Sequence, residues 1–319
     1  MLLEKVRKEE WEEVLGGSEQ GTIFHRWEWL KIVEKHTGFK LLPLMAFKGS
    51  NPIALYPIFF KRKLAFSPPP KSAIPYLGPA FVEYSKLKED KRLSLFVDVQ
   101  KEMERLLSKF GMVVIDLPRG LKDCRPFKWN GYGIDPIFHY ILKLDENVWS
   151  GFKKEFRENV KRSTKRGVTV EEGDLDFVYD SLKELYESRG EKLRISKSYI
   201  KEVYDALGNR AKVFVAKKDT EPLIGTIVLL HRETVQFWVG GAKPKVRGVY
   251  PNETLHWEVM KWAMRNGYTE FEEFGAGTER LAKFKSKYNP KLEVCFRARR
   301  SNGIMNVVEK VYRRVRGLV

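Results

Sequence analysis

The sequence is poor in cysteine and in long uncharged stretches. Its two cysteines, Cys124 and Cys295, cannot build a disulfide framework and are typical of a reducing compartment. The longest uncharged run, residues 49–60, contains two prolines and is shorter than the roughly 20 residues of a membrane-spanning helix. Residues 1–13 are charged from Glu4 onward and have no apolar stretch, so we expect no signal or transit peptide. These absences predict a cytoplasmic protein without a transmembrane segment.

The composition is otherwise that of a folded, basic protein. Hydrophobic residues make up 43% and aromatic residues 13% of the 319 residues, which excludes a disordered chain; this length predicts two domains. The 59 Lys and Arg residues exceed the 42 Asp and Glu residues and leave a formal net charge of +17. This excess favours phosphate-bearing partners or an anionic membrane surface. The charged fraction of 32%, together with few Gln and Cys, predicts a thermophilic source.

The two halves of the chain match each other when one is moved along the other without a gap. The matched residues are Ala46, Lys48, Pro52 and Arg62 in the first half and Ala216, Lys218, Pro222 and Arg232 in the second. In each half a strand-like run, a polar turn and a second strand-like run follow one another, which predicts a hairpin. We interpret the two hairpins as parts of duplicated domains, with convergent hairpin sequences as the alternative.

Helices and strands are expected to alternate around these hairpins. Apolar residues spaced three and four apart predict helices at 27–35, 87–110, 177–189, 198–207, 253–266 and 304–315. Short strands are expected at 269–274 and 292–298, an irregular proline-rich loop at 68–79, and the seam between the halves at 142–151. Asn252 is predicted to cap the helix that follows it, with Trp257, Met260, Trp262 and Ala263 on the buried face.

The basic charge is concentrated in two segments, residues 153–166 and 283–316. The first holds seven basic and two acidic residues, and the second eleven basic and two acidic residues. In the first segment an apolar stripe at helical spacing leaves Arg157, Lys161 and Lys165 as a neighbouring cationic row. This row is either a solvated helix face or a surface that contacts phosphates.

Ordered sequence blocks in the second half carry a family resemblance. They are residues 156–168, 236–242, 250–257 with 262–268, and 271–277 with the Phe-Lys-Ser-Lys-Tyr run at 284–288. Segments 27–29, 56–57 and 129–132 of the first half also belong to this resemblance. On these blocks the chain resembles the FemABX-type aminoacyltransferases and their relatives in the GNAT acyltransferase superfamily.

The resemblance implies an α/β (α+β) fold with two tandem GNAT-like domains, each a mixed central sheet flanked by helices. We expect one domain at 1–145, joined by a C-terminal helix at 301–319, and a second at 146–300 that carries the Phe-Lys motif. The implied enzyme transfers an aminoacyl or acyl group from an activated donor to a primary amine and forms an amide. Such a reaction needs aligned reactants, removal of one proton and stabilisation of an oxyanion. The serine-hydrolase and zinc-protease motifs are absent from the sequence, and no metal site is expected.

The resemblance also implies site residues. Lys285 of the Phe-Lys motif is the predicted catalytic cation, which steadies developing negative charge or a donor phosphate. Glu273 is the predicted acceptor of the amine proton, with ion pairing as the alternative. Phe284 and Trp238 are predicted to contact substrate, with burial in the core as the alternative. His256 is interpreted as a core residue without a chemical role.

Further residues complete this prediction. The substrate site is expected to include Gly240, Gly241, Tyr250, Asn252, Gly275 and Gly277. The glycines after the 236–239 strand would permit a backbone bulge or the close approach of a ligand. The donor phosphate is expected to contact Arg157, Lys161, Lys165 and Arg247.

Two donors remain open, aminoacyl-tRNA and acyl-coenzyme A. The tRNA donor is implied by the peptidoglycan-building members of the family, although the long helical hairpin that some of them use as a tRNA arm is not recognisable after Phe177. The loop at 243–250 has one glycine and a proline, which fits poorly with a coenzyme A pyrophosphate loop because such a loop needs bare backbone amides. The alternatives are therefore a coenzyme A-dependent GNAT N-acetyltransferase and a non-catalytic RNA-binding protein with the same fold. The acceptor is expected to be a small-molecule or peptide amine, and the sequence does not predict an oligomeric state.

Overall fold

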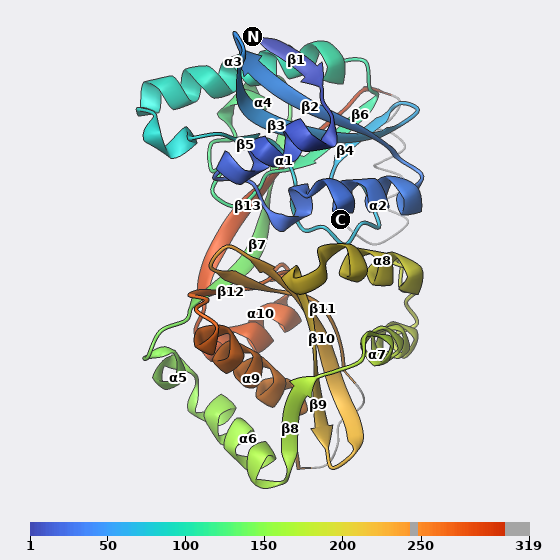
Figure 1. The fold of residues 1–319 in the computed structure, drawn as a ribbon, viewed down its shortest axis with the longest axis vertical. Coiled ribbons are helices and arrows are strands. Elements are labelled where there is room, and N and C mark those ends of the chain that lie inside the picture. Colours follow the sequence, from blue (N-terminus) through green and yellow to red (C-terminus); the bar gives the residue numbers. More distant parts are fainter. Residues whose placement is uncertain (243–247, 304–319) are drawn as a thin grey trace. The chain divides into compact units, whose positions relative to one another are not determined.

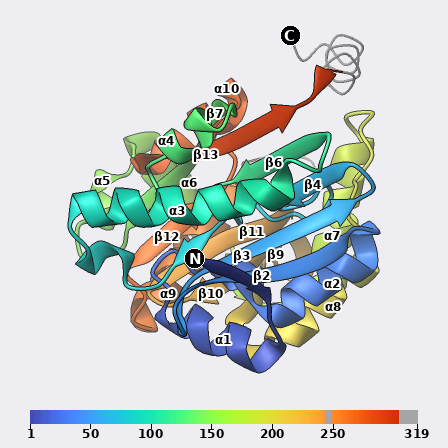
Figure 2. The same cartoon turned by 90° about the horizontal axis from the view of Figure 1, so that it is seen from above.

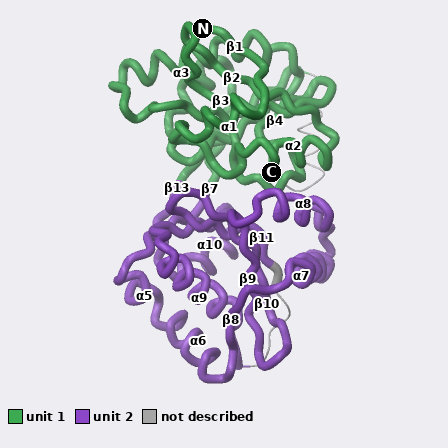
Figure 3. The backbone as a smooth tube through the Cα atoms, in the orientation of Figure 1, with its two compact units in different colours: residues 1–137, 294–319 green, residues 138–293 purple. Residues whose placement is uncertain are grey.

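The computed structural model describes residues 1–242 and 248–303. The chain divides into two compact units, unit 1 with residues 1–137 and 294–319 and unit 2 with residues 138–293 (Figure 3). The domain bounds expected from the sequence, 1–145 and 146–300, stay a prediction. The predicted helix at 304–315 and the loop residue Arg247 lie outside the described residues. None of the helices in the described part combines the length and the apolar character that a membrane crossing requires.

Unit 1 is a mixed sheet with helices on both faces. Its strands pair in the order β1-β2-β3-β4-β6-β13, and β5 pairs with β3. Among its strand pairs in the described part of the chain, β4 and β6 are the parallel one. The elements are β1 (Leu2–Lys5), α1 (Lys8–Gly17), α2 (Trp27–Thr37), β2 (Lys40–Lys48), β3 (Asn51–Lys61), β4 (Leu64–Ser67), β5 (Ala80–Phe81), α3 (Glu89–Leu107), β6 (Met112–Asp116), α4 (Arg125–Trp129) and β13 (Lys291–Ser301).

The core of unit 1 lies between α3 and one face of β2 and β3. Ala46 and Tyr56 pack in one cluster with α3, which contributes Phe96, Val99 and Met103 at helical spacing. Helices α1 and α2 contact β3 and β2 from the opposite face (Figures 1 and 2). Both faces of these strands are therefore covered, which explains why they read as nearly continuous apolar runs.

Unit 2 has the same kind of sheet, with strands in the order β7-β12-β11-β10-β9-β8. Strands β11 and β12 are its parallel pair, and the other neighbours are antiparallel. The elements are β7 (Gly133–Lys143), α5 (Val148–Gly151), α6 (Lys154–Lys165), β8 (Val168–Glu172), α7 (Leu175–Glu187), α8 (Lys197–Leu207), β9 (Ala211–Lys218), β10 (Glu221–His231), β11 (Thr234–Ala242), α9 (Pro251–Arg265), β12 (Glu270–Glu273) and α10 (Glu279–Lys285).

Helices also cover both faces of the unit 2 sheet. Helices α6 and α9 contact each other and the strands on one face, whereas α7 contacts β10 and β11 on the other (Figure 1). The core between the sheet and the α6/α9 face includes Phe156, Val160, Leu255 and Val259. Phe156 and Val160 belong to the apolar stripe predicted for the first basic segment, which the structure confirms as the buried side of α6.

The two hairpins have the same local geometry at matching positions. In β2–β3, Ala46 pairs with Ala54 and Phe47 pairs with Pro52, so Ile53 is an extra, bulged residue. In β9–β10, Ala216 pairs with Ile224 and Lys217 with Pro222, which leaves Leu223 bulged. Gly49 and Asp219 occupy corresponding turn positions with φ of 62° and 56°. The predicted register between the halves is thus confirmed down to the bulge and the left-handed turn residue.

The last strand of each repeat is exchanged. Strand β7 follows the first repeat in sequence, but its residues 140–143 pair with β12 of unit 2. Strand β13 follows the second repeat, but its residues 297–301 pair with β6 of unit 1. Each sheet therefore needs a strand from the other half of the sequence.

The elements predicted within the described residues are present, with one correction at a helix start. The five helices predicted between residues 27 and 266 all occur, and 68–79 forms neither helix nor strand. Asn252 is not the N-cap of α9, because the helix begins one residue earlier at Pro251 and Tyr250 is its N-cap. Proline suits the first helical position since it has no N–H that would need an acceptor. Met260 and Ala263 are buried as predicted, whereas Trp257 and Trp262 are half-buried.

Candidate active site

A buried polar cluster surrounds the carboxylate of Glu273 at the end of β12. Glu273 is 3% exposed. Its Oε1 lies 2.7 Å from His256 Nε2 and accepts a hydrogen bond of 3.1 Å from the Tyr288 hydroxyl. Its Oε2 lies 3.1 Å from Lys285 Nζ. One carboxylate thus holds three donors, which come from α9, the end of α10 and the turn after it.

The fold brings these residues together from separate segments. The β11–β12 register pairs Glu273 with Phe237, whose ring stacks on the His256 imidazole at 4.3 Å between ring centroids. Helix α9 carries His256 over this face of the sheet. Helix α10 begins at a Thr278 cap, whose hydroxyl accepts from Leu281 N–H, and ends at Lys285.

His256 has a polar partner at each ring nitrogen. Its Nδ1 lies 2.8 Å from the backbone carbonyl oxygen of Asn252, and its Nε2 faces the carboxylate of Glu273. The cluster therefore places the His256 ring, the Tyr288 hydroxyl and the Lys285 ammonium around one carboxylate.

These neighbours determine the acidity of Glu273. Burial by itself would raise its pKa, but the charges of Lys285 and His256, with the hydrogen bonds they donate, lower the pKa to about 2. The Tyr288 pKa is raised well above its usual value by burial and then by the Glu273 charge. A carboxylate that already accepts three bonds and has so low a pKa is a poor proton acceptor, so the geometry favours the ion-pairing alternative for Glu273.

Lys285 is 9% exposed and also donates to the carbonyl oxygen of Phe274. An ammonium group has three N–H donors, and Glu273 and Phe274 take two of them. No other residue in the described part of the chain accepts the third. The bond to Phe274 holds the start of the segment that contains the exposed Gly275, which has φ of +74°, and the exposed Gly277.

Phe284 lies beside this cluster and is half-buried. Its ring meets the rings of His256 and Tyr288 edge to face, with centroids 5.8 and 6.3 Å apart, and packs against the core of unit 2. Lys287 Nζ lies 5.9 Å from its centroid. Phe284 is therefore both part of the core and a partly exposed face next to Lys285.

Trp238, Gly240 and Gly241 lie farther along β11. The β10–β11 register shifts after Phe237, because Phe237 pairs with Val228 and Val239 with Ile227, so the half-buried Trp238 is the bulged residue. Gly240 and Gly241 pair with Thr226 and Gly225. The β12 pairing ends at Phe237 and Glu273, whereas β11 continues to Ala242. The cluster thus stands where the two parallel strands stop pairing.

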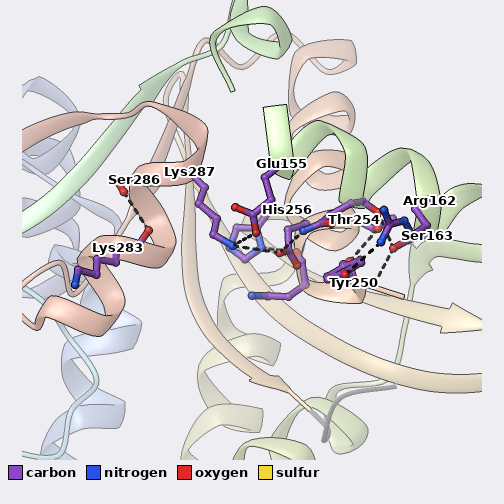
Figure 4. A network of polar contacts seen from close by, with 12 residues as sticks. Glu155, Arg162, Ser163, Tyr250, Thr254, His256, Lys283, Ser286 and Lys287 are labelled. Atoms are coloured by element: carbon purple, nitrogen blue, oxygen red, sulfur yellow. Dashed lines mark hydrogen bonds and ion pairs between the residues drawn. The ribbon is translucent and has the colours of Figure 1, made fainter. Parts of the chain in front are cut away.

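Tyr250 and Asn252 hold the start of α9. Tyr250 N–H donates to Ser163 Oγ of α6 at 2.7 Å, and the guanidinium of Arg162 lies 5.8 Å from the Tyr250 ring centroid (Figure 4). Asn252 contributes its backbone oxygen to His256. On the other side of α9, Lys287 Nζ lies 3.4 Å from Glu155 and 3.8 Å from Glu253 (Figure 4). These contacts fix α6, α9 and the segment after Lys285 to one another.

Two of the predicted phosphate contacts meet in a groove. Lys161 and Lys165 line a groove of about 450 Å³ between α6 and α9, together with Trp149, Trp257 and Lys261. The ring centroids of Trp149 and Trp257 lie 4.5 Å apart, and Lys261 Nζ lies 5.8 Å from the centroid of the Trp257 ring. Arg157 is half-buried and does not line this groove. Arg247 lies outside the described residues.

The contacts of His256 and Tyr288 with Glu273 were not predicted from the sequence. Both residues stand in the blocks quoted above, His256 within 250–257 and Tyr288 at the end of 284–288, and as polar residues within apolar motifs they would have been candidates. Their distance from Glu273 depends on how α9 and α10 pack, which no spacing in the sequence reveals. In the described residues no group of three or more His, Cys, Asp or Glu side chains is arranged to hold a metal ion.

Comparison with known proteins places this site in a known type of domain. Residues 150–286 match the family described as acetyltransferase (GNAT) domain. No curated protein matches the chain.

Solved structures resemble the chain over nearly its whole length. The structure of FemX is 18% identical, covers 93% of this chain and 97% of its own, and has a TM-score of 0.67. L-PGS from Bacillus licheniformis is 16% identical over 98% of this chain and 97% of its own, with a TM-score of 0.61. A tandem GNAT protein from the clavulanic acid biosynthesis pathway is 12% identical over 93% and 98%, with a TM-score of 0.55. The chain therefore has the mixed α/β tandem GNAT fold, and residues 150–286 match the acetyltransferase (GNAT) domain family.

Proposed function

We propose that this protein is a FemAB-like N-acyltransferase, which transfers an aminoacyl or acyl group from an activated donor to a primary amine. The observation that carries the proposal is the Lys285 ammonium, fixed by Glu273 and Phe274 at the end of the parallel strand pair in the GNAT-family region. One N–H of this cation remains for a ligand. A fixed, desolvated cation is suited to stabilise negative charge that develops on an acyl carbonyl oxygen.

The reaction forms one bond and breaks another. The neutral amine nitrogen attacks the acyl carbon, an amide bond forms, and the ester or thioester bond of the donor breaks. The amine loses one proton, and the departing alkoxide or thiolate takes one up. Because the oxygens of Glu273 are occupied by three donors, we assign Glu273 and His256 the positioning of Lys285, and we expect the amine proton to leave through the leaving group or water.

The groove between α6 and α9 supports an RNA-borne donor. Lys161 and Lys165 provide positive charge beside the two half-buried indoles, whereas Lys261 is paired with Glu258 of the same groove at 2.7 Å. Basic side chains next to aromatic faces are the usual surface for a single nucleic-acid strand, because phosphates meet the charges and bases stack on the rings. An aminoacyl-tRNA presents such a strand at its acylated end.

A coenzyme A donor is the second candidate, and the description of the matching family as an acetyltransferase favours it. Calorimetric titration with acetyl-coenzyme A separates the two donors. Binding at about micromolar Kd supports the thioester, whereas binding of aminoacyl-tRNA but not of acetyl-coenzyme A supports the RNA-borne donor.

Replacement of Lys285 tests the proposal. With a panel of labelled aminoacyl-tRNAs, acetyl-coenzyme A and amine acceptors, we expect Lys285→Ala to lower the transfer rate by about 100-fold while donor affinity changes little. Lys283→Ala is the matched control, because Lys283 lies on the same helix, is exposed and pairs with Glu279. Lys285→Arg keeps the charge and should retain part of the rate, which separates loss of chemistry from loss of folding.

Two results would contradict the proposal. A Lys285→Ala variant with the wild-type rate removes Lys285 from catalysis. RNA binding without amide formation from any donor and acceptor pair identifies a non-catalytic RNA-binding protein.

A further inference from the structure

Unit 1 contains a cavity beside its own parallel strand pair. The cavity has a volume of about 430 Å³ and is lined along β6 by Met112, Val114 and Asp116, the last of which ends the strand. The rest of the lining is Phe66 of β4, residues 68–74 and 135–137, and Arg297 and Arg299 of β13. A volume of this size is in the range of sites that bind small molecules.

The central polar group of this cavity is an arginine held in a fixed position. Arg297 Nε and Nη2 donate to the two carboxylate oxygens of Asp116 at 2.6 and 2.7 Å. Asp116 is 4% exposed, whereas the Arg297 side chain is 45% exposed. The buried carboxylate therefore anchors one edge of the guanidinium and fixes its plane.

The rest of the guanidinium is available to a ligand. A guanidinium has five N–H donors, and the pair with Asp116 uses two of them. No other acceptor for Arg297 occurs among residues 1–242 and 248–303. Three N–H groups on a fixed fork match the oxygens of a carboxylate or phosphate group.

The charges around the cavity also favour an anion. Asp116 is paired with Arg297, and Asp135 lies 3.8 Å from Arg299. The exposed Lys71 lines the same cavity and has no acidic partner in the part of the chain that the structure describes. The lining thus has one more cation than anions. Phe66, Ile74 and Val114 provide apolar surface for the remainder of a ligand.

The duplicated fold allows the position of this cavity to be compared with that of the candidate active site. In unit 2 the candidate active site stands where β11 and β12 stop pairing, and β4 and β6 are the corresponding pair in unit 1. The two copies of the module therefore both carry a cluster of charged groups at the same end of the same strand pair.

We propose that this cavity binds a small molecule with a carboxylate or phosphate group and an apolar body, with the anionic group on Arg297. The site is separate from Lys285, and its test is a binding measurement that does not depend on acyl transfer. Failure of this proposal therefore leaves the proposed function untouched.

The test compares three probes on the full chain: hexanoate, hexyl phosphate and hexan-1-ol. They share an apolar tail and differ in the head group. We expect saturable binding of at least one anion at up to about 10 mM, at least about tenfold tighter than hexan-1-ol. A preference for hexanoate or for hexyl phosphate identifies the head group.

Variants tie the binding to Arg297. Asp116→Asn with Arg297→Gln keeps a hydrogen-bonded pair of similar shape without charge, and should weaken anion binding by about tenfold or more. Arg297→Lys keeps the charge but loses the fork, and should give a smaller loss; it also serves if the double variant does not fold. Arg105→Gln is the matched control, because Arg105 also pairs with a carboxylate, that of Glu102, outside this cavity.

Three results would overturn the proposal: no binding of either anion in this range, equal binding of hexan-1-ol, or undiminished anion binding by the Arg297 variants. Thermal melting of each variant checks that it is folded.

Discussion

At the scale of single residues, the chemistry of the candidate site depends on how many donors one carboxylate accepts. Glu273 holds His256, Tyr288 and Lys285 at once. Each donor is oriented by the same anion, so the site is preorganised before any substrate arrives. Lys285 acts on the substrate in the proposed reaction, and the other members keep its ammonium in place.

Neutralising Glu273 should lower the free energy of unfolding by an amount that depends on pH in a defined window. The folded-state pKa of about 2 lies below the ordinary value of 4.5, so the ionised carboxylate stabilises the fold fully above pH 4.5, and this contribution is lost as the pH falls towards 2. For Glu273→Gln we expect a loss of about 3 kcal/mol in the free energy of unfolding at pH 7. The difference from wild type should shrink between pH 4.5 and 2, measured by urea denaturation.

The exposed Glu171, which pairs with Lys217 on the surface of unit 2, provides the control. Glu171→Gln should change the unfolding free energy by less than about 1 kcal/mol at any of these pH values. A Glu273→Gln effect that stays the same from pH 7 to pH 2 would contradict the ion-pair assignment.

At the scale of elements, α6 combines a buried stripe with a cationic groove. Phe156 and Val160 pack in the core, whereas Lys161 and Lys165 line the groove with Trp149 and Trp257. The sequence predicted the stripe and the cationic row from helical spacing. The indoles from α5 and α9 were not predicted to meet there, because their approach depends on the packing of three helices.

The groove predicts how RNA affinity depends on salt concentration. If a single RNA strand contacts Lys161 and Lys165, Lys161→Gln with Lys165→Gln should weaken RNA binding and reduce the slope of log affinity against log salt concentration by about 1.4. Fluorescence anisotropy with a labelled tRNA acceptor-end oligonucleotide measures both. Lys154→Gln is the control on the same helix, since Lys154 is exposed and pairs with Glu158. An unchanged slope in the double variant excludes the groove as the phosphate contact.

At the scale of the whole molecule, the exchange of the last strands means that the two units should differ in whether they fold as separate fragments. Residues 138–293 include every segment that pairs in the unit 2 sheet. Residues 1–137 lack β13, so β6 would lose a neighbour and the buried Asp116 would lose Arg297. A buried carboxylate without its partner is strongly destabilising.

We therefore expect the fragment 138–293 to unfold cooperatively by itself and the fragment 1–137 not to do so. Circular dichroism during urea denaturation distinguishes the two behaviours. Joining residues 294–303 to residue 137 through a flexible Gly-Ser linker should restore a cooperative transition to unit 1. Cooperative unfolding of 1–137 without this addition would show that the exchanged strand is dispensable.

The sequence by itself determined the local features of this protein. Helical and strand periodicities, the hairpin turns and the match between the halves depend on near neighbours in the chain, and Gly49 and Asp219 take the same turn conformation as a result. The family motifs singled out Lys285, and they did so without any knowledge of its contacts.

Only the tertiary structure decided what the residues of the site do. The pKa of Glu273 is low because His256, Lys285 and Tyr288 converge on its carboxylate from other segments. Likewise, the fixed guanidinium of Arg297 exists because β13 pairs with β6, more than 170 residues earlier in the chain. Protonation and preorganisation depend on distances between side chains, and packing sets those distances.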